Sequence, residues 1–146
     1  ASIIFSTLGI FQLLGLLLGG YLGDRFDKRW ICTFCMFFNG AGILLLAHIE
    51  ELSIILLFCI IHGLAFGVRI PQVVSLRAEY FGTKSYGKIL GFSSLIVMFG
   101  FLGGPMICGF LFDLYGNYSI AFFTIGIITL LGGLCFILTK VPEGMN

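Results

Sequence analysis

Long uncharged apolar runs alternate with short charged segments along this chain. The runs cover residues 1–23, 30–49, 52–76, 89–112 and 114–139, and the third of them contains a single arginine, Arg69. A helix needs about 20 predominantly apolar residues to cross the hydrocarbon core of a bilayer. The pattern therefore predicts an all-α, polytopic transmembrane bundle of five helices, forming one partial transmembrane domain over residues 1–146.

The composition supports a membrane protein and excludes several other classes. Hydrophobic residues make up 59% of the chain, charged residues make up 10%, and the mean hydropathy is +1.12. A soluble domain carries about 25% charged residues. A soluble enzyme, a nucleic-acid-binding protein and a disordered chain are therefore excluded. We expect the lipid bilayer as a partner, no nucleic acid and no cofactor.

All five cysteines lie within the apolar runs. Cys32 and Cys35 have the spacing of a metal-binding pair, but no second pair and no nearby cluster of ligands accompanies them. We therefore interpret the cysteines as small apolar residues of the helices, and we expect no metal site.

Basic residues are confined to one side of the predicted bundle. Segments 24–29 and 77–88 and the C-terminal tail hold seven of the eight Lys and Arg residues. The opposite side holds Glu50, Glu51 and Asp113 and no basic residue. Because cytoplasmic loops carry the excess of Lys and Arg, we expect a multi-pass protein of the cell (plasma or inner) membrane. Its N-terminus would lie outside and its C-terminus in the cytoplasm.

The first residue, Ala1, already lies within an apolar run, and no initiator methionine precedes it. An odd number of helices with an outside N-terminus is also unusual for a complete carrier. We therefore expect a fragment that is missing N-terminal helices of the same chain.

Small residues recur one helical turn apart in three of the five runs. These positions are Gly15, Gly19 and Gly23 in the first run, Gly63 and Gly67 in the third, and Gly100 and Gly104, followed by Pro105, in the fourth. Because lipid tails are as apolar as leucine, membrane helices associate through close packing, which small residues permit. The glycines indicate either static packing or surfaces that slide and rock. A proline removes an amide and bends its helix, so we expect a bend at Pro105.

The turn after the first run has the sequence Gly20-Tyr-Leu-Gly-Asp24-Arg25-Phe-Asp27-Lys28-Arg29. It resembles the charged loop of the major facilitator superfamily of secondary transporters, with Asp27 in place of the inner glycine of that loop. Three further motifs follow in order: Arg77-Ala-Glu-Tyr-Phe-Gly82, Tyr86-Gly-Lys-Ile-Leu-Gly91, and Gly103-Gly-Pro-x₃-Gly109-x₃-Asp113-x₂-Gly-Asn-Tyr118. They resemble the last three helices of bacterial relatives of oxalate/formate antiporters and monocarboxylate carriers.

The resemblance implies a twelve-helix fold of two similar halves, with the charged loop after the second helix of each half. The five spans therefore match either helices 2–6 or helices 8–12. The turn from Asp113 to Tyr118, and the end of the chain soon after the last span, favour helices 8–12, the C-terminal half.

In the superfamily the charged loop acts as a cytoplasmic latch between conformational states. The resemblance assigns this role to Asp24, Arg25, Lys28 and Arg29, together with Glu79 after the third span. By position, Asp24 would face a helix end of the other half, and Arg25 or Arg29 would pair with Glu79. The alternative is that these charges only fix the topology of the chain.

Few polar side chains lie within the spans. The candidates for a substrate or proton pathway are Gln12, His62, Arg69, Gln72, Ser93 and Ser94. Polar groups at this depth are costly and mark functional positions by default. His62 titrates near neutral pH and either carries a proton or bonds a neighbouring backbone group. Arg69, two turns further along the same face, either binds an anion or extends its side chain to the membrane surface. The serines often bond their own helix backbone.

The chain also departs from the monocarboxylate carriers. Those carriers place Asp and Arg one turn apart in helix 8, where this chain has Gln12 and Leu16. No Asp or Glu lies within any predicted span. Their proton-linked carboxylate mechanism therefore lacks its acidic group in this part of the protein.

We expect part of a secondary active transporter that moves a small organic solute by alternating access, with a proton or a counter-substrate. An organic anion such as a monocarboxylate is one candidate solute. One alternative is half of a drug or metabolite efflux antiporter, because Gly100-x₃-Gly104-Pro105-x₃-Gly109 resembles the antiporter motif of the fifth helix. Another is a small five-span membrane protein that acts through a partner. An enzyme is not expected, because no metal cluster or nucleophile–base pair is visible within the spans.

Overall fold

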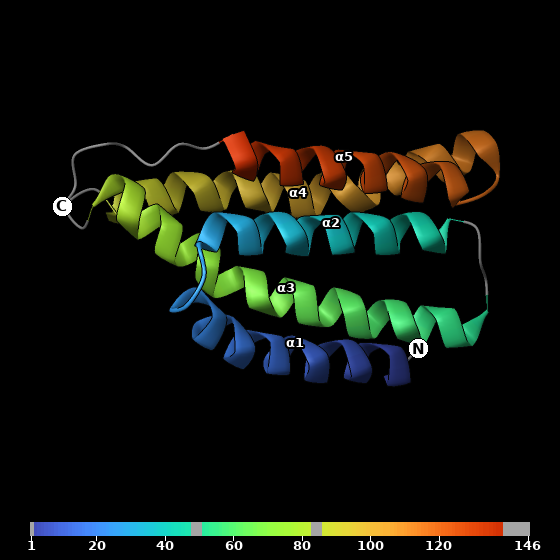
Figure 1. Cartoon of the computed structure of the whole chain (residues 1–146). Helices are drawn as coiled ribbons and strands as arrows, with labels where there is room; N and C mark the ends of the chain where they lie inside the picture. The colour runs from blue at the N-terminus through green and yellow to red at the C-terminus, as the bar shows by residue number, and fades with distance from the viewer. Residues whose placement is uncertain (1, 48–50, 83–85, 139–146) are drawn as a thin grey trace.

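The computed structural model describes residues 2–47, 51–82 and 86–138. Within them the chain forms five helices: α1 (Ser2–Gly23), α2 (Lys28–Leu46), α3 (Leu52–Phe81), α4 (Tyr86–Tyr115) and α5 (Ser119–Leu138) (Figure 1). Each is long and apolar enough to cross a membrane, which confirms the predicted transmembrane helical fold. Residues 1, 48–49 and 139 of the expected spans, and the charged residues Glu50, Lys84 and Lys140, lie outside the described residues.

α3 and α4 extend beyond the apolar runs that predicted them. α3 continues to Phe81 and α4 begins at Tyr86, so Arg77, Glu79 and Lys88 lie on helical turns. α3 ends at Gly82, whose φ of 67° lies in the left-handed region and whose N–H donates to the carbonyl oxygen of Ala78 at 3.0 Å. Glycine is the residue that adopts this conformation without steric cost.

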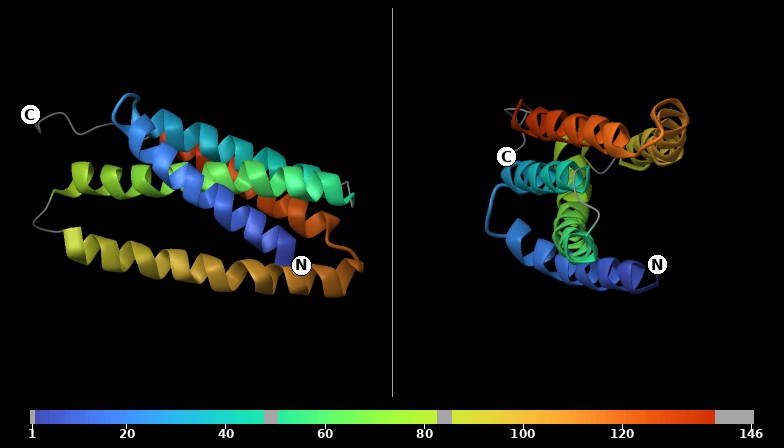
Figure 2. Two further views of the ribbon diagram at one scale, coloured as in Figure 1. Left: turned by 90° about the horizontal axis from the view of Figure 1, so that it is seen from below. Right: turned by 90° about the vertical axis from the view of Figure 1, so that its right-hand side faces the viewer.

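α3 lies at the centre of the arrangement. α1 packs along α3, and α2 lies between α3 and α5 (Figure 1). Seen end-on, α1, α3, α2 and α5 follow one another in a curved row, with α4 beside it (Figure 2). α4 contacts α3 and α5 only lightly, and none of its residues is buried against the rest of the described chain.

Large apolar side chains point outward on every helix, and the few buried apolar residues are small. Phe5 is 76% exposed and Leu138 is 78% exposed, whereas Cys32 and Ala121 are fully buried. Lipid covers an apolar surface as well as protein does, so membrane helices gain more from close backbone approach than from burying large side chains.

Glycines bring the backbones of α1 and α3 into direct contact. A Cβ atom at Gly19 would lie 2.7 Å from the carbonyl oxygen of Val68, and one at Gly63 would lie 2.8 Å from that of Leu8. At Gly15 and Gly67 the Cβ would likewise collide with a backbone carbonyl of the other helix. We call Gly15, Gly19, Gly63 and Gly67 the glycine seam. Four of the glycines predicted to pack therefore face one another in a single interface.

The predicted glycine motif of the fourth run has a different setting. α4 continues as one helix through Pro105 to Tyr115. A Cβ atom at Gly104 would have no neighbour within 4 Å among the described residues. The packing role of Gly104 and the bend at Pro105 therefore stay predictions.

Candidate functional site

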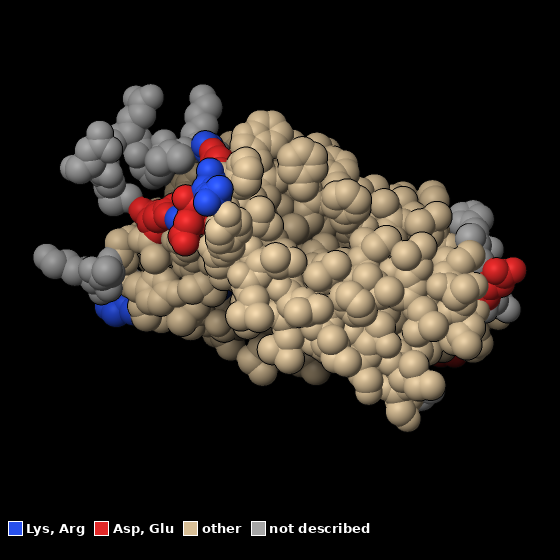
Figure 3. Space-filling view, turned by 60° about the horizontal axis from the view of Figure 1, so that its bottom comes forward, with Lys and Arg blue, Asp and Glu red and all other residues tan. Residues whose placement is uncertain are grey.

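Charged residues gather at one end of the bundle, where the α1–α2 turn, the end of α3 and the start of α4 lie (Figures 2 and 3). We call this the basic end; its Lys and Arg residues among those described are Arg25, Lys28, Arg29, Arg77 and Lys88. In the face shown in Figure 3 the coloured charged side chains at the opposite end are acidic, and the described surface between the two ends is uncharged. This is the charge asymmetry that the sequence predicts.

Asp27 begins α2 as its N-cap. Its backbone is extended, with φ −62° and ψ 118°, and its Oδ1 accepts a hydrogen bond from the backbone N–H of Arg29 at 3.0 Å. The guanidinium of Arg29 donates to both carboxylate oxygens, from Nε to Oδ1 at 3.2 Å and from Nη2 to Oδ2 at 2.8 Å. These hydrogen bonds hold the pKa of Asp27 below its usual value. The residue that replaces the loop's inner glycine therefore starts a helix.

Lys28 joins the charged turn to the end of α3 by an ion pair with Glu79. The prediction that Arg25 or Arg29 forms this pair is wrong. Arg29 is held by Asp27, and the guanidinium carbon of Arg25 lies 4.7 Å from the ring centroid of Tyr21. Since the side chain of Glu79 is 52% exposed, solvent screens the pair, and such pairs contribute about 0–1 kcal/mol.

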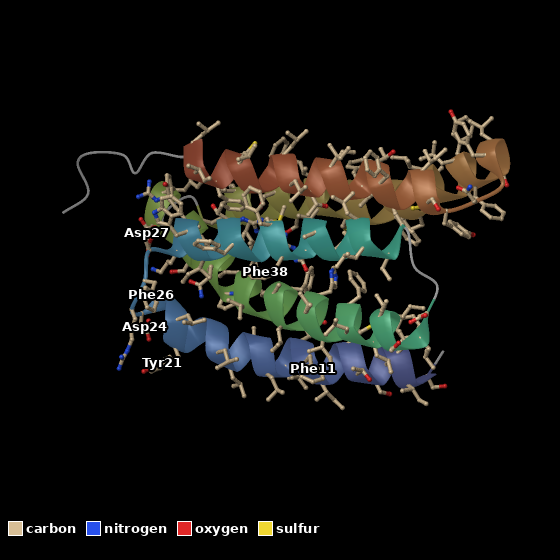
Figure 4. The ribbon with its side chains drawn as sticks, turned by 45° about the vertical axis from the view of Figure 1, so that its right-hand side comes forward. Phe11, Tyr21, Asp24, Phe26, Asp27 and Phe38 are labelled. Carbon is tan, nitrogen blue, oxygen red and sulfur yellow. The ribbon has the colours of Figure 1, made fainter. Side chains whose placement is uncertain are left out.

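Asp24 lies on the same turn, next to Tyr21 and Phe26 (Figure 4). It is exposed, and no residue of the described chain forms an ion pair with it. Its expected partner would belong to the other half of a transporter. The latch role of Asp24 therefore stays a prediction.

His62 lies in a row of aromatic rings along α3. Its ring centroid is 5.0 Å from that of Phe58 and 6.0 Å from that of Phe66. The guanidinium carbon of Arg69 lies 5.1 Å from the centroid of Phe66, so His62 and Arg69 do share one helical face. The Nδ1 atom of His62 is buried and has no hydrogen-bond partner within the described residues.

A cavity of about 490 Å³ lies between α3 and α4. Arg69 and Arg77 of α3 and Ser94 of α4 are its polar lining residues, and Val73, Val97 and Phe101 are among the apolar ones. We call it the Arg69 cavity. Arg69 also donates from Nη1 to Sδ of Met36, which is a weak acceptor. No carboxylate of the described chain forms an ion pair with Arg69 or Arg77.

The other predicted pathway residues lie elsewhere. Gln72 is 1% exposed and donates from Nε2 to the carbonyl oxygen of Gly19, beside Gly23, so it fastens α3 to α1. Gln12 lies in the same interface and is half-buried. The hydroxyl of Ser93 donates to the carbonyl oxygen of Leu90 at 3.2 Å. Of the six candidates, the structure therefore brings only Arg69 and Ser94 together in the Arg69 cavity.

Comparison with known proteins decides the family. A model of the Major Facilitator Superfamily matches residues 1–146, the whole chain. The chain belongs to the Major Facilitator Superfamily. This confirms the resemblance drawn from the charged turn and the later motifs.

Named relatives of this major facilitator chain include monocarboxylate transporters and a quinolone resistance protein. It is 26% identical over 150 residues to monocarboxylate transporter 12 of Rattus norvegicus, covering 100% of this chain and 31% of the relative. It is 27% identical over 141 residues to monocarboxylate transporter 10 of Homo sapiens, covering 93% of this chain and 27% of the relative. It is 28% identical over 123 residues to the quinolone resistance protein NorA of Staphylococcus aureus, covering 84% of this chain and 30% of the relative. The chain thus spans about a third or less of the length of these relatives.

The sequence of this major facilitator chain does not by itself identify Arg77 as a cavity residue. Arg77 follows the apolar run, and its position there indicates one of the charges that fix topology. Its spacing of eight residues from Arg69, a little over two helical turns, was the signal that both side chains share one face of α3.

Proposed function

We propose that the chain forms part of a secondary active transporter that binds a small organic anion in the Arg69 cavity and moves it by alternating access. One observation carries the proposal: Arg69 and Arg77 line the same cavity, and neither has a carboxylate partner among the described residues.

The chemistry of the lining favours an anion with an apolar body. Arginine presents paired donors that match a carboxylate, and its charge acts strongly where apolar walls exclude water. Val73, Val97 and Phe101 supply such walls. A volume of about 490 Å³ is in the range of small-molecule sites, about 300–1,000 Å³. The monocarboxylate transporters among the relatives also support an organic anion as the solute.

The helix contacts support alternating access at the boundary between α3 and α4. α1 is fixed to α3 by the glycine seam, whereas α4 meets α3 only lightly, beside the cavity. Relative movement of the α1–α3 pair and α4 would change access to Arg69 without breaking a tight interface. The Lys28–Glu79 pair at the basic end is weak enough to bias such closely balanced states without locking them.

The test is uptake of labelled solutes by vesicles that contain the full-length protein to which this chain belongs. We expect uptake of a short monocarboxylate such as lactate, with Arg69→Gln raising its KM about tenfold or more, the effect of removing one partner of a desolvated charge pair. Lys88→Gln, which removes an exposed charge at the basic end, is the matched control and should leave KM unchanged. Equal KM values for Arg69→Gln and the wild type would refute anion binding by Arg69.

Drug efflux is the second candidate function, and the relationship to NorA favours it. Its glycine–proline motif lies on α4, where no residue is buried against the described chain. Efflux of a cationic dye from the same vesicles, insensitive to Arg69→Gln and accompanied by no monocarboxylate uptake, would establish this function in place of the first.

A further inference from the structure

A second cavity, of about 300 Å³, lies at the basic end between α2, α3 and the end of α5. Its polar lining residues are Arg29, Arg77 and Tyr80, and we call it the Tyr80 cavity. Leu76, Phe81 and Phe136 form its apolar walls. It shares Arg77 with the Arg69 cavity but opens at the end of α3 that lies beyond the apolar run.

Two polar groups of the Tyr80 cavity, Tyr80 and Arg77, have donors without a partner among the described residues, whereas Arg29 is paired. The hydroxyl oxygen of Tyr80 is buried and has no hydrogen-bond partner among the described residues. Arg77 has neither an ion pair nor a hydrogen bond there. Arg29 is bonded to Asp27, and its charge also acts on Tyr80. A phosphate oxygen would accept hydrogen bonds from the Tyr80 hydroxyl and the Arg77 guanidinium, and such charge-assisted bonds are strong.

The apolar walls select among the anions that carry a phosphate. A free phosphate ion makes no favourable apolar contact with Leu76, Phe81 and Phe136, whereas the first carbons of an acyl chain would cover these side chains. Phe81 is 56% exposed in the described chain and is available for such a contact. Basic pockets between transmembrane helices, at the headgroup level of the side rich in Lys and Arg, are typical binding sites of anionic lipids.

We propose that the Tyr80 cavity binds the phosphodiester group of an anionic phospholipid, with Arg77 and Tyr80 as its donors and Arg29 supplying further positive charge. The lipid would stand beside the end of α3 and stabilise the basic end of the bundle. The proposal does not depend on which solute the Arg69 cavity takes.

The test is titration of the purified full-length protein with phosphatidylglycerol in mixed detergent micelles, with the fraction that retains one lipid read by native mass spectrometry. We expect Arg77→Gln to weaken retention about tenfold, the loss of one charge-assisted contact. Tyr80→Phe removes only the hydroxyl, is expected to keep the fold, and should weaken retention by about threefold. Lys88→Gln removes an equal charge from the same end, outside the cavity, and should behave as the wild type.

Four results would overturn the proposal. If Lys88→Gln weakens retention as much as Arg77→Gln, the lipid responds to overall charge and not to a site. If phosphatidylcholine is retained as well as phosphatidylglycerol, the cavity does not select an anionic headgroup. If inorganic phosphate alone displaces the lipid at equal concentration, the site takes the free ion. Unaltered retention in Tyr80→Phe would remove the hydroxyl from the site.

Discussion

Asp27 illustrates how one residue at variance with a family motif acquires a structural role. The superfamily pattern has a glycine at this point, and here an aspartate caps α2 and binds Arg29 through both carboxylate oxygens. The sequence interpretation noted Asp27 only as a departure from the motif, because the cap depends on an extended backbone that spacing alone does not reveal.

Replacing Asp27 with alanine should destabilise the protein by about 0.5–2 kcal/mol, the cost of losing an N-cap. Asp27→Asn retains a capping side chain and loses only the charge, so it should cost less than about 1 kcal/mol, since the carboxylate is 42% exposed. Thermal unfolding of the full-length protein in detergent measures both values. Equal losses for the two variants would contradict the capping role.

The stability provided by Asp27 should also depend on pH. Its folded-state pKa lies below the usual value of 3.8, so the unfolded chain takes up the proton first as the pH falls. The contribution is therefore complete above the unfolded pKa and is lost as the pH drops through the folded one. The difference in unfolding free energy between wild type and Asp27→Asn should be constant near neutral pH and disappear in strong acid.

His62 is a titratable side chain deep within α3, and its Nδ1 has no partner in the described part of the chain. If it carries a proton during transport, His62→Gln should flatten the dependence of uptake on pH. Phe66→Leu changes a neighbouring ring and keeps the titratable group, so it is the control. An identical pH profile for His62→Gln and wild type would leave His62 with a packing role.

At the scale of the helices, the glycine seam holds the backbones of α1 and α3 in close contact. Gly67→Ala should destabilise the full-length protein by about 1–3 kcal/mol, the usual cost of overpacking, because its Cβ would collide with the carbonyl of Gln12. Gly9→Ala, on the same helix pair but with open space around the new Cβ, is the matched control. Similar unfolding temperatures for the two variants would contradict the backbone contact.

The helices could be predicted from the sequence because hydropathy and length alone decide what crosses a bilayer. The pairing of the helices could not be predicted, since the glycine motifs of the first and third runs do not indicate which helix each one contacts. The ion-pair partner of Glu79 was missed for a related reason. Lys28, Arg25 and Arg29 are close in sequence, and the sequence does not show that Arg29 binds Asp27 instead of Glu79. The cavity role of Arg77 depended on α3 continuing past its apolar run.

At the scale of the whole molecule, charge is distributed between two ends of the bundle, and the basic end is expected to face the cytoplasm. Single cysteines test this in a variant of the full-length protein without its native cysteines. Ser119→Cys, at the opposite end, should react with a membrane-impermeant thiol reagent on intact cells. Phe26→Cys, on the α1–α2 turn, should react only after the membrane is permeabilised. The reverse pattern would invert the orientation.

The glycine seam has a consequence for how this protein can evolve. When two side chains meet, a larger one on one helix can be accommodated by a smaller one on the other, and such pairs change together in related sequences. At Gly15, Gly19, Gly63 and Gly67 the opposing atoms include backbone carbonyls, which no mutation can shrink. These positions should therefore be invariant rather than correlated among close relatives, and this close backbone contact should leave almost no covariation signal.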